Sequence, residues 1–435
     1  MKTINGLILL ALFLLPAKEL FAQVEGASQS RSGSFYSLFG VGFPTDNSNP
    51  RELGMGILGV SLHSDDSNTL QNPALWGTNV FTSASSGFNL TQFRASSESS
   101  NSINQLLEAG YLQFTFPIVR EKVGISASLY SVTRSNYRFV TLDSTATSPT
   151  NMLEYASDIR GSGGVNKLEF GLGWKINENI AVGYAPSLTF VSQNNSEDVF
   201  FSESGYGTSN SDARITGTAM GHRFGTLLTF RELFRANDRI SFGATATLPV
   251  TIDAKEKTTV TKFVNGREQE VLLRDPKQGE ITLPVELNAG LTYYPTSLVN
   301  FSLEGLYEQW SDYESAFDRG TELSYMKDRV KAGLGVEYHP YRTNSTRFLS
   351  NFRYSGGVTF DSGHLNIEGE DINTLWFSAG LGIISPNPRT RSSVDISIRY
   401  GLRGTTNNDL IRENIWALNL SINLSELMFF RQKLN

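Results

Sequence analysis

The chain has 435 residues, a net charge of −6, and acidic and basic residues spread along its whole length. This even spread leaves no basic patch for nucleic acid, and the absence of cysteine excludes disulfides, thiolate nucleophiles and cysteine metal sites. Glycine (39), phenylalanine (28) and tyrosine (16) are abundant, which suits twisted β-sheets with aromatic girdles.

The first 22 residues have the layout of a secretory signal peptide. Lys2 precedes an apolar stretch at residues 6–16, and Ala22 offers a small residue for cleavage. The apolar stretch is too short to cross a bilayer as a helix. No later apolar run is long enough for a transmembrane helix. We therefore expect an exported protein whose mature chain starts at Gln23.

Much of the mature chain alternates apolar residues with polar or small ones. Every second residue of 240–252 is apolar, and residues 416–424 repeat the pattern. A strand between lipid and lumen needs such alternation over about 9 to 11 residues. Fourteen such strands predict an all-β fold, a transmembrane antiparallel β-barrel over residues 79–435. Their centres lie near Gly87, Thr115, Ala127, Gly171, Ala185, Gly225, Ala246, Ala289, Leu303, Leu334, Gly356, Ala379, Ile398 and Leu420.

The connections alternate between short turns and long polar segments. Short turns occur at residues 120–122 and 177–179, whereas long segments occur at 141–163, 194–212 and 254–280. Bacterial barrels place short turns in the periplasm and long loops outside. We therefore expect the outer membrane of a Gram-negative bacterium, with both termini periplasmic. A soluble all-β protein also alternates, but no blade-like repeat is present.

Residues 23–78 do not alternate and are rich in Ser, Gly and Asn. A barrel of about fourteen strands encloses a lumen too wide for its own side chains to fill. The segment is therefore predicted to be an N-terminal plug, or hatch, within the lumen. It contains Tyr36-Ser37-x-Phe39-Gly40-x-Gly42, a Met55-Gly56 pair and Asn72-Pro73-Ala74.

This order of signal peptide, plug motifs and strands resembles the FadL/TodX family, outer-membrane transporters of long-chain fatty acids and other hydrophobic compounds. The resemblance covers the whole mature chain in architecture but only the plug in residues. It implies that Asn72, Pro73 and Ala74 lie in the plug inside the barrel. It also implies passive uptake of hydrophobic compounds, foremost long-chain fatty acids.

The third strand changes phase near Tyr130 and Ser131, which predicts a bulge or kink there. In the FadL/TodX family a kink in this strand opens a lateral path toward the membrane. Ordinary irregularity at the barrel rim explains the change of phase about as well.

Charged residues occupy the polar phase of several strands. An Arg or Lys that faces lipid costs about 2 to 4 kcal/mol near the midplane, so we expect these side chains to face the lumen. A lattice of ion pairs that binds the plug is the favoured interpretation. The alternative is that Arg399 and Arg403 bind the carboxylate of a ligand. The charges are Glu286, Glu304, Glu308, Lys331, Glu337, Asp395, Arg399 and Arg403.

The sequence predicts no enzyme, no metal and no cofactor. Its four histidines lack the spacing of a metal site, and no G-x-S-x-G motif is present. The expected partners are the lipid bilayer and a hydrophobic small molecule, with a protein partner at the extracellular loops as an alternative. Two rival functions stay open, a barrel of this build that docks a protein in a secretion system and a general porin. The histidines are His63, His222, His339 and His364.

Overall fold

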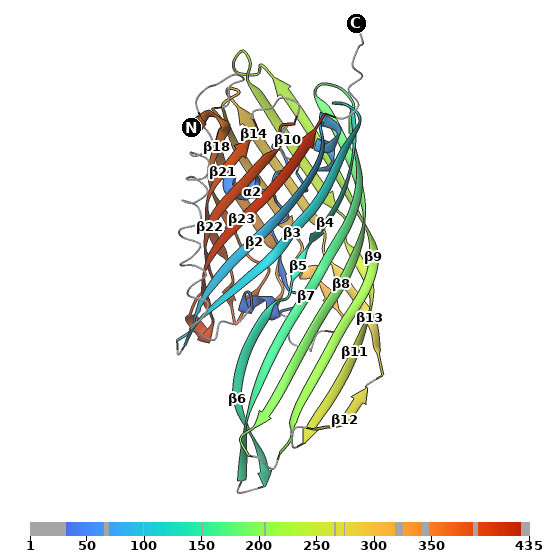
Figure 1. Ribbon diagram of the computed structural model, residues 1–435, viewed down its shortest axis with the longest axis vertical. Helices are drawn as coiled ribbons and strands as arrows, with labels where there is room; N and C mark the ends of the chain where they lie inside the picture. The colour runs from blue at the N-terminus through green and yellow to red at the C-terminus, as the bar shows by residue number, and fades with distance from the viewer. Residues whose placement is uncertain are drawn as a thin grey trace, which may run out of the picture.

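The computed structural model is a closed antiparallel β-barrel of 14 strands (Figure 1). It describes residues 32–64, 69–98, 100–148, 151–203, 206–264, 267–273, 275–317, 325–340, 348–385 and 390–427. The predicted signal peptide, residues 1–22, lies outside these ranges. None of the helices within them is long and apolar enough to span a membrane.

Each predicted strand centre falls within a strand of the wall, so the predicted fold is confirmed. Successive wall strands pair antiparallel, and β2 pairs with β23 to close the barrel. The uninterrupted strands are β2 (Thr82–Ser96), β3 (Asn101–Val119), β7 (Asn151–Lys175), β8 (Ile180–Phe201), β9 (Thr208–Arg231), β17 (Arg329–Tyr338), β18 (Phe352–Asp361), β21 (Thr374–Ile384), β22 (Ser393–Arg403) and β23 (Arg412–Glu426).

The other wall strands consist of consecutive pieces. The break between β10 and β11 contains Pro249, and the break between β13 and β14 contains Pro284, a residue that cannot donate to a β-ladder. The pieces are β4 (Val123–Ser131) with β6 (Tyr137–Ser148), β10 (Arg239–Thr247) with β11 (Val250–Val264), β13 (Lys277–Leu283) with β14 (Glu286–Tyr294), and β15 (Val299–Glu308) with β16 (Glu314–Ser315). Strand β12 (Arg267–Leu273) pairs with β11.

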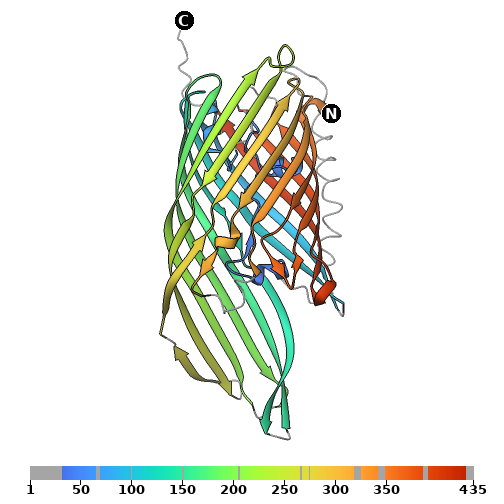
Figure 2. The ribbon, with the colours of Figure 1, turned by 180° about the vertical axis from the view of Figure 1, so that it is seen from behind.

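The two ends of the barrel differ in length. Strands β6 to β9, β11 and β12 run far beyond the rest of the wall, at the lower end of Figures 1 and 2. The 25 residues of β7 alone span about 80 Å at 3.3 Å per residue. Long loops were predicted at 141–163, 194–212 and 254–280, and this prediction was wrong, because strands occupy most of each range. Both faces of a strand outside the bilayer can meet water, so the alternation that marks membrane strands is missing.

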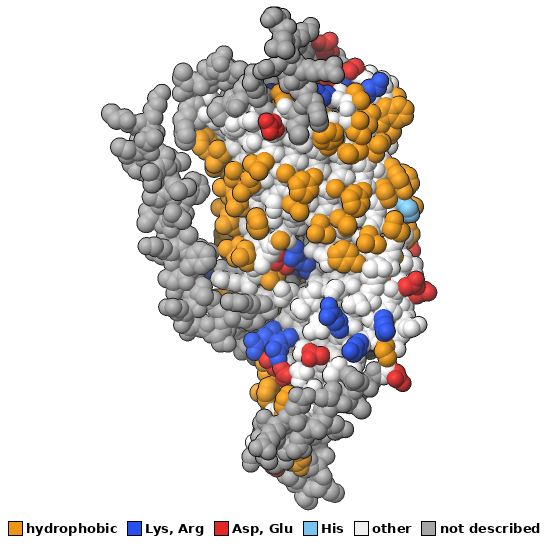
Figure 3. Space-filling model, turned by 45° about the vertical axis from the view of Figure 1, so that its right-hand side comes forward, with side chains coloured by type: hydrophobic (Ala, Val, Ile, Leu, Met, Phe, Trp, Pro, Cys, Tyr) orange, Lys and Arg blue, Asp and Glu red, His pale blue; other side chains and the backbone are white. Residues whose placement is uncertain are grey.

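A broad apolar band surrounds the outer surface. Figure 3 shows hydrophobic side chains covering the upper part of the visible face, with charged side chains below them. Phe114, Phe170 and Leu334 are each more than half exposed in this band. Large apolar side chains exposed in such number fit a surface that contacts lipid.

The segment before β2 packs against the inner face of the wall (Figure 1). Its short helix α2 starts with a capping box between Asn49 and Glu52 and ends at Gly56, whose φ of 67° suits glycine. All six residues of α2 are buried. The elements of the segment are η2 (Phe35–Leu38), β1 (Phe43–Pro44), α2 (Pro50–Met55) and η3 (Pro73–Thr78).

The apolar band is tested by Ala246→Arg. Ala246 lies opposite Phe224 on one neighbouring strand and Leu287 on the other, and both are exposed to the outside. The substitution is expected to lower the free energy of unfolding by about 2 to 4 kcal/mol, because it places a cation in hydrocarbon.

Urea titration of the barrel in lipid vesicles measures this change. Met152→Arg is the matched control, because Met152 is exposed on the long extension outside the band. Equal destabilisation by the two substitutions would mean that the band does not contact lipid.

Candidate functional site

A single wall carboxylate binds a loop of the N-terminal segment. Glu304 on β15 is 2% exposed and accepts four consecutive backbone N–H groups, from Leu58 to Ser61, at 2.6–3.1 Å. The Ser61 hydroxyl donates a fifth hydrogen bond at 2.7 Å. Gly59 has a φ of 92°, a left-handed conformation that suits glycine. Backbone donors that converge in this way form a nest for an anion, and here the anion belongs to the wall.

Ion pairs fix the neighbouring helix α2 to the adjacent part of the wall. Arg51 of α2 donates two hydrogen bonds of 2.7 Å to Glu337 on β17. Arg353 on β18 contacts Glu337 at 3.3 Å and Asp395 on β22 at 2.5 Å. All four side chains are buried. They join the N-terminal segment to three wall strands, which matches the ion-pair lattice favoured from the sequence.

Asp46 connects two wall cations. It lies between Lys331 on β17 and Arg399 on β22, and Arg399 Nη1 donates to Asp46 Oδ2 at 2.6 Å. Burial raises the pKa of Asp46, but the charges of Lys331 and Arg399 outweigh burial and hold the pKa well below its usual range. Arg399 also stacks over Trp376, 4.2 Å from the ring centroid.

Arg403 also contacts a carboxylate and an aromatic ring of the protein. Its Nη1 lies 3.3 Å from Glu413 and donates to the Ser34 hydroxyl at 3.1 Å, and its guanidinium lies 4.0 Å from the Phe43 ring centroid. The structure therefore places both Arg399 and Arg403 against carboxylates and aromatic rings of the protein. A ligand carboxylate would have to compete with Asp46 or Glu413 for them.

A cavity of about 160 Å³ lies beside these arginines. Arg399 and Arg403 line one side of it, together with Asp46. An apolar cluster of four buried residues, packed against the partly buried Leu106, forms another side. The cluster consists of Phe93, Trp376, Ile415 and Ala417. The cavity thus joins a charged surface to an apolar one, as in sites for small molecules.

The wall is interrupted next to this cavity. Strand β4 ends at Ser131, directly after Tyr130, and the chain then turns to the N-terminal segment, where β5 (Thr133–Arg134) pairs with β1. Among the described strands, β2 is the one that pairs with the outer part of β3, residues 101–110. An ion pair of 2.5 Å between Arg134 and Glu108 bridges the gap, and both residues line the cavity.

The Asn-Pro-Ala motif contacts a different part of the wall from the ion pairs. Asn72 is fully buried, and its side-chain amide donates to the backbone carbonyls of Val60 (2.8 Å) and Thr226 (2.9 Å). Its Oδ1 accepts from the N–H of Ala74, so Asn72 caps η3, which Pro73 begins. The motif therefore connects the segment to β9.

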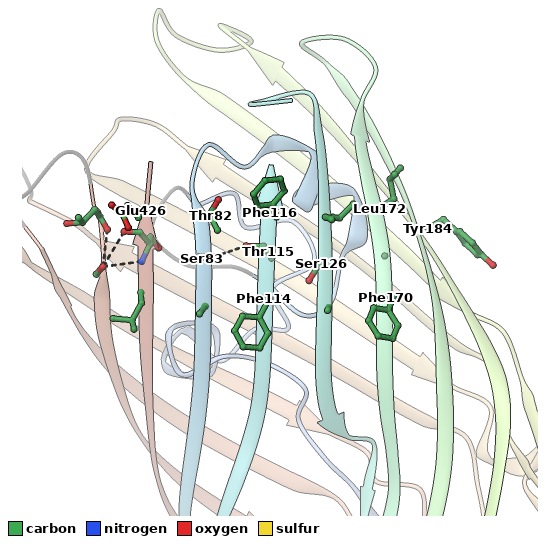
Figure 4. A pocket seen from close by; sticks show the side chains of 18 of the residues that line it. Thr82, Ser83, Phe114, Thr115, Phe116, Ser126, Phe170, Leu172, Tyr184 and Glu426 are labelled. Carbon is green, nitrogen blue, oxygen red and sulfur yellow. Dashed lines mark hydrogen bonds between the residues drawn. The ribbon is translucent and has the colours of Figure 1, made fainter. Parts of the chain in front are cut away.

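Figure 4 shows a second hollow, of about 1030 Å³, on the outer surface. Its walls include Phe114, Phe170 and Leu172, which belong to the apolar band. We assign this hollow to contact with lipid acyl chains. Within the described ranges, no group of three or more histidine or acidic side chains is placed to bind a metal ion.

Sequence reasoning identified the wall charges but not their partners. Glu304 and Glu337 occupy the polar positions of alternating strands, and this alternation can be recognised in the sequence. Asp46 and Arg51 stand in a segment without periodicity, and nothing in the sequence pairs them with residues about 290 to 350 positions away.

The nest predicts the effect of Glu304→Gln. An amide offers one acceptor oxygen where the carboxylate offers two, and its NH₂ group faces backbone donors. The substitution is therefore expected to lower the free energy of unfolding by about 2 kcal/mol or more and to increase ion conductance. Thermal unfolding and planar-bilayer conductance measure the two effects.

Glu178→Gln is the matched control for Glu304→Gln, because Glu178 is an exposed acid in a short turn. Wild-type stability and conductance in Glu304→Gln would show that the nest does not hold the segment in place.

The fold is shared with solved transport proteins at low sequence identity. The CymD monoaromatic hydrocarbon channel is 15% identical, with a TM-score of 0.55 over 88% of this chain and 98% of that chain. The Ralstonia pickettii toluene transporter TbuX is 14% identical, with a TM-score of 0.54 over 88% and 99%. A Pseudomonas aeruginosa FadL homologue is 11% identical, with a TM-score of 0.59 over 88% and 99%.

No curated protein sequence matches the chain. The FadL/TodX resemblance therefore holds for the fold, which these channels share. The family model that matches is a different one, described as BamG, and it covers residues 8–435. The chain belongs to the BamG family.

Proposed function

We propose that this protein is an outer-membrane channel for the passive passage of small hydrophobic compounds, with residues 23–78 as its plug. The cavity beside the interrupted wall is the observation that carries this proposal. It joins apolar residues of the lumen to a gap between β3 and β6, and Arg399, Arg403 and Asp46 lie on its charged side. The channels that share the fold, described as hydrocarbon channels or toluene transporters, support it.

The size of the cavity favours a compact compound. A cavity of about 150 Å³ lined by apolar side chains is large enough for benzene. The 160 Å³ cavity therefore suits a ligand with one ring better than an extended fatty acid. A long-chain fatty acid, which was expected from the family resemblance, would require the plug to move.

Passage needs no covalent chemistry. A compound would enter the cavity against Phe93 and Trp376 and leave through the gap when the Arg134–Glu108 contact opens. The Asp46 and Glu304 contacts would keep the rest of the plug in place meanwhile. Such a channel would work without closing or opening the whole lumen.

A second function, docking of a protein at the extracellular end, is supported by aromatic residues far from the apolar band. Tyr155, Phe201 and Tyr206 form a chain of ring contacts at 6.0 and 5.7 Å near the end of β8, and Tyr206 is 45% exposed. Exposed aromatic groups of this kind are typical of protein interfaces. A stoichiometric partner that is lost in Tyr206→Ser would favour docking over passage.

Filling the cavity tests the transport proposal. Ala417→Leu adds three carbon atoms to a buried inward position of the cavity wall. Toluene uptake by cells or vesicles that carry the variant is expected to fall about tenfold, because the ligand loses its space.

Ala379→Leu is the matched control, because it is the same substitution at an exposed position on the outer face of β21. Both variants should keep the heat-modifiable migration of a folded barrel. Undiminished toluene uptake in a folded Ala417→Leu protein would remove the cavity from the route.

The role of Arg399 in binding a carboxylate is tested by a pair of ligands. If its guanidinium binds the ligand carboxylate, Arg399→Ala should weaken the binding of benzoate about tenfold while leaving methyl benzoate unchanged. Isothermal titration of the purified barrel measures both. Equal losses for the two ligands would assign Arg399 to bracing the plug through Asp46.

A further inference from the structure

Two arginines lie directly opposite each other at one mouth of the barrel. Arg231 ends β9, Arg239 starts β10, and the two residues are cross-strand partners. Strand β9 runs from the long extension to Arg231, so this mouth lies at the other end of the barrel, the upper end in Figure 1. Like charges directly opposite each other destabilise an antiparallel pair of strands. An anion bound between the two arginines would remove this repulsion.

The described acidic residues neutralise these two arginines only weakly. Arg231 lies 3.4 Å from Glu178, but the two side chains are 61% and 69% exposed, and ion pairs so exposed contribute little. Within the described ranges Arg239 forms no ion pair, and its Nε atom is buried without a hydrogen-bond partner. Among the described residues, both guanidinium groups therefore have N–H donors left for a ligand.

An aromatic ring holds Arg239 in place. Its guanidinium lies 4.0 Å from the ring centroid of Tyr294, the cross-strand partner of Arg239 on β14. The Tyr294 hydroxyl in turn accepts a hydrogen bond of 2.9 Å from the backbone N–H of His63 in the N-terminal segment. Stacking uses the face of a guanidinium and leaves its edge for paired hydrogen bonds to an oxyanion.

Both arginines line a hollow of about 560 Å³, here called the mouth hollow. Two of the three acids in its lining already have partners. Glu337 pairs with Arg51, and Asp238 accepts three backbone N–H groups of its own turn at 2.8–3.1 Å. The mouth hollow therefore has an excess of positive charge. Its charged lining consists of Arg51, Arg231, Glu232, Asp238, Arg239, Glu337 and Arg391.

We propose that Arg231 and Arg239 bind a phosphate group in the mouth hollow. Each guanidinium can donate two parallel N–H groups, and a phosphate has enough oxygens to accept from two guanidinium groups at once. The phosphate can come from a phospholipid head group or from free phosphate. Neither arginine lines the cavity beside Trp376, so this site is independent of the proposed passage of hydrophobic compounds.

The turn between the two arginines favours the phospholipid as the source. Leu233 and Phe234 in this turn are 57% and 71% exposed, and the edge of the Phe234 ring contacts Tyr293 at 6.0 Å between centroids. Apolar side chains exposed at the rim of a membrane protein are suited to contact with lipid. Basic pockets beside such a surface bind phospholipid head groups. Leu233 and Phe234 would then contact the acyl chains of the bound lipid.

Isothermal titration of the purified full-length barrel in phosphate-free detergent solution tests the site. The probes are inorganic phosphate and the short-chain lipid dihexanoyl phosphatidylglycerol. Arg231→Gln and Arg239→Gln are each expected to weaken the binding of both probes about tenfold, because each variant loses one charged pair of donors. Heat-modifiable migration confirms that each variant is folded.

Arg235→Gln is the matched control, because Arg235 is an exposed arginine of the same turn that does not line the mouth hollow. It should bind both probes as the wild type does. Binding of the lipid at least tenfold tighter than inorganic phosphate would identify a head-group site, and equal affinity would identify a site for free phosphate. Absence of saturable binding of both probes to the wild type would overturn the proposal whether or not the variants fold. An equal loss in Arg235→Gln would also overturn it.

Discussion

A wide barrel with charged residues on its inner wall is stable only if those charges find partners, because an unpaired buried charge costs several kcal/mol. In this protein the N-terminal segment supplies many of the partners. Glu304 accepts hydrogen bonds from four backbone N–H groups and a hydroxyl of residues 58–61. Arg51 forms an ion pair with Glu337, and Asp46 forms ion pairs with Arg399 and Lys331. The wall and the segment therefore stabilise each other, and neither inner surface is complete alone.

This dependence also explains where a cavity occurs. The lattice joins the N-terminal segment to β15, β17 and β22, and the apolar cluster on β2, β21 and β23 lies directly beside Arg399 of β22. The wall is interrupted next to this cluster, because the chain after Ser131 turns inward to pair β5 with β1. One inward turn thus positions Arg134 against Glu108, opens an edge on β3 and β6, and leaves about 160 Å³ beside them.

The sequence predicted the membrane part of the fold well and the rest poorly. Alternation is imposed by lipid on one side and lumen on the other, so all fourteen strand centres could be found, including weak ones such as Gly87. Beyond the bilayer this constraint ends, and β7 and β8 continue through residues that look like polar loops. The site depends on pairs such as Asp46 with Arg399, which are distant in sequence and joined only by the folded segment. The fold common to CymD and TbuX likewise says little about such pairs at 14–15% identity.

Hydrogen–deuterium exchange of the folded protein in lipid tests the central claim, that the wall carboxylate Glu304 holds the N-terminal segment. The amides of Leu58, Gly59, Val60 and Ser61 donate to this buried carboxylate, so they should exchange as slowly as amides in the middle of β15. Exchange of these four amides within seconds, while those of β15 stay protected, would contradict the account.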